Sequence, residues 1–137
     1  MSKPFSMRVS ESTEARLKAA AGRADIAPRT LAQRYVEEGL RMDEHPHVYF
    51  ADGPAGRRAR VHGTGLDVWE VVSTVRDNDG DPAEAAAYLQ LPTGVVQAAM
   101  AYYAAHRAEV DAWIERNELA SAHAEESWKA AERAVSR

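Results

Sequence analysis

Residues 3–17, KPFSMRVSESTEARL, combine two hydrophobic periodicities in one short stretch. Apolar and polar side chains alternate over residues 5–9, which predicts a short, half-buried strand with Ser6 and Arg8 on its polar face. Ser10 is a favourable N-cap, and the acidic residues that follow it suit the first turn of a helix. The stretch therefore predicts a strand that leads directly into a helix.

A second helix is predicted to begin at Pro28, because proline suits the first helical position, and to end before residues 43–46. Its predicted apolar stripe is Leu31, Tyr35, Val36 and Leu40. A single strand has no neighbour to hydrogen-bond with, and two short amphipathic helices leave much of their apolar faces uncovered. The pattern therefore predicts a dimer. The sequences that carry a family resemblance here are MRVSE (7–11), ARLK (15–18) and RTLAQRYVEEGL (29–40). They resemble the ribbon-helix-helix repressors, which implies that residues 1–46 form an obligate, DNA-binding dimer.

The repressor resemblance implies five candidate DNA-binding residues. Ser6 and Arg8 would read bases, because a two-stranded ribbon fits the major groove and arginine pairs with guanine. Lys3, Arg29 and Thr30 would contact the backbone, the last two at a helix start that lacks a hydroxyl or acidic cap and leaves its amides available to a phosphate. The alternative is a solvated edge strand, with water on those amides.

The middle of the chain predicts a β-hairpin followed by three helices. Two short apolar segments, 48–50 and 59–61, flank a turn-rich sequence. Helical patterns follow over 68–77, over 82–88 with Asp81 as its cap, and over 93–106 with Tyr103 among its inward-facing residues. A last helix is expected over 108–136.

A second resemblance is carried by VHGTGLDV (61–68), GDPAE (80–84) and AAMAYYAAH (98–106). These sequences are similar to a helix-turn-helix-like module of VapB-type antitoxins. Gly65 stands where that family usually has an arginine, and Leu89 where it usually has a proline. The resemblance implies a partner toxin of the PIN-domain ribonuclease type, whose acidic magnesium site is commonly blocked by a basic antitoxin side chain.

Charge is distributed unevenly along the 137 residues, although the net charge is only −4. Residues 1–42 carry +3 and residues 67–137 carry −7. Residues 77–106 hold no Lys or Arg, so the third helix of the module, at the place of a recognition helix, is expected to bind protein rather than DNA. The predicted hairpin of the same module does carry cations, Arg57, Arg58 and Arg60. These residues either contact the DNA backbone or form a solvated basic loop tip.

The apolar content of the last helix thins beyond Asn117, where alanines predominate. Such a helix usually needs a partner chain to remain ordered, and tryptophan is a common interface anchor. The candidate toxin-binding residues are Arg116, Trp128, Lys129 and Arg133. The alternative is an exposed, fraying tail.

Several classes of site are not supported. The chain has no cysteine, which excludes disulfides and thiol chemistry, and no catalytic constellation or nucleotide fingerprint emerges. The acidic turn at 77–81 lacks the EF-hand ligand spacing, and His45 with His47 is a weak metal signal. We therefore expect no enzyme, no cofactor and no metal, and a cytoplasmic protein without a membrane segment.

The expected fold class is mainly α, with an N-terminal ribbon-helix-helix (1–46), a β-hairpin with a helix-turn-helix-like three-helix module (47–107) and a long C-terminal helix (108–137). The expected function is that of an antitoxin that represses its own operon and neutralises a PIN-domain-type ribonuclease, as a homodimer or higher even oligomer. A stand-alone repressor, with the second module serving dimerisation or ligand sensing, is the alternative.

Overall fold

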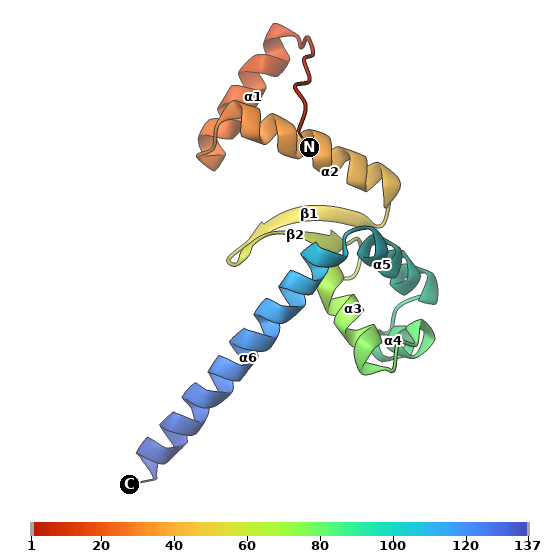
Figure 1. Ribbon diagram of the computed structural model, residues 1–137, viewed down its shortest axis with the longest axis vertical. Coiled ribbons are helices and arrows are strands. Elements are labelled where there is room, and N and C mark those ends of the chain that lie inside the picture. The colour runs from red at the N-terminus through yellow and green to blue at the C-terminus, as the bar shows by residue number, and fades with distance from the viewer. Residues whose placement is uncertain (1, 137) are drawn as a thin grey trace. The chain divides into compact units, whose positions relative to one another are not determined.

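The computed structural model describes residues 2–136, and the chain divides into two compact units (Figure 1). Unit 1 (Met1–Asp43) contains helix α1 (Glu11–Ala24) and all but the last residue of helix α2 (Pro28–Glu44). Unit 2 (Glu44–Arg137) contains a small sheet and four helices. The described residues are therefore mainly helical, as the sequence predicts.

The first regular element is a helix, so the predicted strand over residues 5–9 and the ribbon-helix-helix fold class are wrong. Residues 2–10 form no helix or strand, and all of them are exposed. Phe5, which should pack on the inner face of such a strand, is 82% exposed. Alternation determines which side chains share a face, but a strand also needs a neighbouring strand that hydrogen-bonds to its backbone, and the described residues of unit 1 form no other strand.

Both predicted helix starts in unit 1 are confirmed. Ser10 caps α1, and its Oγ accepts a hydrogen bond from the Thr13 N–H at 3.1 Å. α1 ends at Asp25, which takes a left-handed conformation with φ of 54° and lets the chain turn toward α2. Pro28 begins α2 as the sequence predicts.

The apolar core of unit 1 is small. Its buried apolar side chains are Ala21 of α1 and Leu31 of α2. The rest of the predicted stripe on α2, Tyr35, Val36 and Leu40, is between 51% and 54% exposed. Unit 1 therefore leaves much of its apolar surface in solvent.

Unit 2 begins with a three-stranded antiparallel sheet in the order β1-β2-β3. Figure 1 labels its two longer strands, β1 and β2. β1 (Val48–Gly53) pairs with β2 (Gly56–Val61), which confirms the predicted hairpin but continues both strands to a two-residue turn. β3 (Leu66–Asp67) was not predicted, because its two residues are too few to show a periodicity. Between β2 and β3 the backbone reverses direction through Gly63 and Gly65, which both have positive φ.

The predicted helices of unit 2 are also present. They are α3 (Val68–Asp77), α4 (Pro82–Leu89), α5 (Thr93–Ala105) and α6 (Arg107–Val135). Asp81 caps α4 as expected, and its Oδ1 accepts from the Ala83 N–H at 2.9 Å. The acidic stretch 77–81 thus connects α3 to α4 by a turn.

A continuous apolar core holds the sheet, α3, α4, α5 and the start of α6 together. The sequence places Tyr103 inward, but the fully buried tyrosine of α5 is Tyr102, and Tyr103 is only partly buried. The Tyr102 hydroxyl donates to Glu109 Oε2 at 2.5 Å, which satisfies the polar end of this buried ring. Val110 and Ile114 are the buried residues that anchor α6.

Candidate DNA and partner interfaces

The five predicted DNA-binding residues all lie on the surface of unit 1. Lys3, Ser6 and Arg8 are exposed on the extended segment 2–10, and Arg29 and Thr30 are exposed in the first turn of α2. Within residues 2–136, none of these five side chains has a hydrogen bond or an ion pair. They are therefore available to an anionic ligand, but no strand organises them.

An open, mostly apolar groove of about 550 Å³ lies on unit 1. Met7 and Val9 of the extended segment form one wall, and side chains from both helices form the rest. The helix residues that line it are Thr13, Arg16, Leu17, Ala19, Ala20, Arg23, Ala32, Tyr35 and Val36. The groove thus includes part of the apolar face that unit 1 does not bury.

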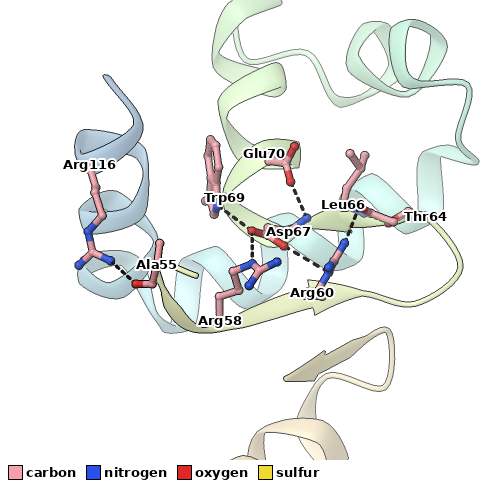
Figure 2. A network of polar contacts seen from close by, with 10 residues as sticks. Ala55, Arg58, Arg60, Thr64, Leu66, Asp67, Trp69, Glu70 and Arg116 are labelled. Carbon is pink, nitrogen blue, oxygen red and sulfur yellow. Dashed lines mark hydrogen bonds and ion pairs between the residues drawn. The ribbon is translucent and has the colours of Figure 1, made fainter. Parts of the chain in front are cut away.

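A buried carboxylate, Asp67, joins the sheet of unit 2 to α3 (Figure 2). Its side chain is 7% exposed. Its Oδ2 accepts from Arg58 Nε at 2.7 Å and from Trp69 Nε1 at 3.0 Å, and its Oδ1 lies 3.3 Å from Arg60 Nε. Asp67 also precedes α3, where its N–H donates to Glu70 Oε1 at 3.0 Å.

This network occupies the arginines of the hairpin. Arg58 and Arg60 both pair with Asp67, and Arg60 Nη2 also donates to the Gly65 carbonyl at 2.5 Å. Arg57 pairs with Asp52 across the strands at 3.3 Å. The three guanidinium groups are therefore paired within unit 2 and do not form a solvated loop tip, while a contact between them and DNA stays a prediction.

The hairpin tip packs against the beginning of α6 (Figure 2). Arg116 Nη1 donates to the Ala55 carbonyl at 3.2 Å, and its guanidinium lies 4.4 Å from the centre of the Trp113 ring. A Cβ atom on Gly56 would lie 3.7 Å from Trp113 Cη2, so the indole covers the turn. Arg116, a predicted toxin-binding residue, is thus also a contact within unit 2.

Beyond Arg116, α6 is exposed over its whole described length. Every residue from Glu115 to Ser136 is exposed, and this half of α6 extends past the other elements of unit 2 (Figure 1). Trp128 is 65% exposed, and Arg133 is exposed nearby. Lys129 pairs with Glu125 at 3.1 Å within the helix, a surface pair of small energetic value.

A second polar network joins α3, α5 and α6 at the surface. Arg76 Nη2 donates to Asp111 Oδ1 and to the Tyr103 hydroxyl, both at 2.6 Å, and the Tyr103 hydroxyl donates to the same carboxylate oxygen at 2.8 Å. Arg107 lies 5.5 Å from the Tyr103 ring centre. The Tyr103 hydrogen bond and the neighbouring Arg76 lower the pKa of Asp111, and the Asp111 carboxylate in turn raises the pKa of Arg76.

The histidines do not assemble a metal site in the part of the chain that the structure describes. His45 packs edge-on against Tyr102 and His106, with ring centres 5.2 and 5.9 Å away. No group of three or more metal-ligating side chains occurs among residues 2–136. Over the same residues, no helix combines the length and apolar content required to cross a bilayer.

Comparisons of the chain with models of known protein families, with curated proteins and with solved structures found no match in any of the three. A functional assignment therefore depends on the residues and their geometry.

Proposed function

We propose that this protein is a type II antitoxin, in which unit 1 binds operator DNA and the C-terminal half of α6 binds and neutralises a PIN-domain-type ribonuclease. The observation that carries the proposal is the exposure of every residue from Glu115 to Ser136 along a continuous helix. Isolated helices gain little stability in water, and most helices in proteins are stabilised by packing. A partner surface would supply that packing, with Trp128 as its anchor.

The distribution of charge supports DNA binding by unit 1. Residues 1–42 carry +3, and the exposed segment 2–10 presents Lys3 and Arg8 without an acidic neighbour in sequence before Glu11. Affinity for DNA rests largely on cations that displace counterions from phosphates. The contact we propose is thus made by an extended, cationic segment and by the start of α2 near Arg29.

The exposed apolar surface of unit 1 supports self-association. Tyr35 and Val36 line the groove on unit 1, and Leu40 continues their face along α2. Covering this surface with a second copy would remove apolar side chains from water and would double the number of DNA-binding segments. Repression of the operon would then require the dimer.

Neutralisation is supported by the cations beside Trp128. Lys129 and Arg133 lie on the same exposed half of α6, and Lys129 makes only a surface pair with Glu125 among the described residues, which costs little to break. A ribonuclease centre built from carboxylates is stabilised by an incoming positive charge, because its own charges repel one another. This is the role that the antitoxin resemblance implies.

The test is co-expression of the chain with the product of the neighbouring gene, with growth as the readout. Deletion of residues 118–137 should abolish rescue of growth and retention of the ribonuclease in a pull-down, while operator binding in a gel-shift assay stays unchanged. Within that segment, Trp128→Ala should weaken retention of the ribonuclease, whereas Leu119→Ala, which removes an equally exposed apolar residue nine positions away along the helix, should not. Rescue by the deleted chain at the level of the full chain would contradict the proposal and favour a stand-alone DNA-binding regulator.

A further inference from the structure

The exposed half of α6 continues a row of residues that is buried at its start. Val110 and Ile114 face the core, and the same alternating spacing of four and three residues continues to the end of the helix. We call this continuation the α6 seam. Its members are Asn117, Ser121, Ala124, Trp128, Ala131 and Val135.

The two flanks of the seam differ in charge. One flank carries a glutamate every seven residues: Glu118, Glu125 and Glu132, each directly after a member of the seam. Their carboxylates form a row with a spacing of about 10 Å along the helix. The opposite flank holds the small, uncharged residues Ala120, Ser127 and Ala134. The seam is therefore acidic on one side only.

This asymmetry disfavours a second copy of α6 as the occupant. In an antiparallel pair of coiled helices, equivalent flanks meet, so the glutamate rows would face each other. In a parallel pair, each glutamate would face an alanine or a serine of the other copy and would gain no partner. Neither arrangement uses the carboxylate row.

Charge complementarity therefore indicates a basic partner. We infer that the α6 seam docks against an amphipathic helix of the partner protein whose apolar stripe is flanked by Lys or Arg, and that these cations pair with Glu118, Glu125 and Glu132. The small residues of the seam let the partner approach closely, while Trp128 is the one large side chain that inserts. This inference rests on the proposed binding of a protein by α6, and it adds the chemistry of the surface that α6 recognises.

The row is available for such pairing. Glu118 and Glu132 are exposed. Among the described residues, Glu125 makes only the surface pair with Lys129, and the two side chains are 66% (Glu125) and 59% (Lys129) exposed. Exposed pairs of this kind exchange partners at little cost.

The experiment measures binding of the full chain to two synthetic helical peptides with the same leucine stripe, one flanked by lysines and the other by glutamates. Fluorescence anisotropy should show at least tenfold tighter binding of the lysine-flanked peptide. The double variant Glu118→Gln/Glu132→Gln should weaken that binding about fivefold. The matched control, Glu115→Gln/Glu126→Gln, removes the same charge from other faces of the helix and should stay within about twofold of the unmodified chain.

Equal binding of the two peptides, or equal loss in the two double variants, would overturn the inference. So would a dimer in sedimentation that Trp128→Ala dissociates, because the seam would then hold a second copy. The proposed function is tested separately with the neighbouring gene's ribonuclease. If the ribonuclease binds the full chain and Glu118→Gln/Glu132→Gln equally well, only the inference fails; if the lysine peptide is preferred but no ribonuclease is bound, only the proposed function fails.

Discussion

Asp67 links three side chains that come from two elements, and its removal should be costly. Asp67→Ala would leave the guanidinium groups of Arg58 and Arg60 in a partly buried site without their carboxylate. Breaking a buried ion pair by removing one partner costs about 3–5 kcal/mol. Urea unfolding followed by tryptophan fluorescence should show a loss of this order in the free energy of unfolding.

The matched control for Asp67 is Asp52→Ala, which breaks the pair with Arg57 on the same hairpin. Because the Asp52 side chain is 74% exposed, the free energy of unfolding should fall by less than about 1 kcal/mol. Equal losses in the two variants would mean that the buried network does not stabilise the sheet.

Asp111 should make the stability of unit 2 depend on pH in the acidic range. The hydrogen bond from Tyr103 and the nearby Arg76 hold the pKa of Asp111 below its ordinary value of 3.8. A lowered pKa stabilises the fold when the group is ionised, so this contribution is present above about pH 4 and is lost as the pH falls through the lowered value. Asp111→Asn should therefore lower the melting temperature at pH 7.

The same variant supplies its own check. The difference in melting temperature between Asp111→Asn and the unmodified chain should shrink as the pH falls below about 4 and through the lowered pKa of Asp111, because Asp111 is then protonated and both chains carry an uncharged group at position 111. A difference that stays constant over this range would show that the loss comes from altered packing rather than from charge.

Single residues show where sequence reasoning reaches its limit. The acidic residue before Val68 and the glutamate three positions later form a capping pattern, so the sequence could have drawn attention to Asp67 as a helix cap. Its pairing with two arginines on another strand depends on the register of β1, β2 and β3, which no local pattern reveals. Tyr102 and Tyr103 are adjacent, and helical periodicity alone did not decide which of them is buried.

Elements were predicted well where the signal is local. Ser10, Pro28, Asp81 and Pro82 mark helix starts through their own chemistry, and the structure has helices at each of these positions. The prediction of a strand over residues 5–9 was wrong because strand formation depends on a neighbouring strand. β3 was missed for the complementary reason, since its neighbour β2 defines it more than its own two residues do.

The two halves of α6 should contribute very differently to stability. Ile114 is 4% exposed, and Ile114→Ala should cost about 2–5 kcal/mol because it leaves a cavity beneath the helix. Trp128 is 65% exposed, and Trp128→Ala should change the free energy of unfolding by no more than about 0.5 kcal/mol. Denaturant unfolding of the two variants makes the comparison.

Hydrogen exchange tests the same division without substitution. Amides after residue 117 should exchange much faster than those of residues 110–114, because unpacked helix opens at low cost. Protection along the whole of α6 in the free chain would show that its C-terminal half is already covered.

At the scale of the whole molecule, the two ends of the chain carry opposite net charge, which suits the proposed binding of DNA at one end and of protein at the other. The +3 of residues 1–42 favours contact with a polyanion, and the −7 of residues 67–137 opposes it. The hairpin arginines add little to the charge of the DNA-binding end, because all three are paired with Asp52 or Asp67 within unit 2. Binding of DNA by the full chain should therefore depend on cations of unit 1 alone.

This dependence can be measured from the effect of salt. Each cation that contacts a phosphate contributes about 0.9 to the slope of log K against log salt concentration on duplex DNA. Lys3→Gln should weaken operator and non-operator DNA alike and reduce the slope by about 1 for each chain bound. Lys129→Gln removes an equal charge from the acidic region and should leave the slope unchanged. If both substitutions reduce the slope equally, the chain binds DNA through its overall charge, and the exposed segment 2–10 has no particular role in contacting the backbone.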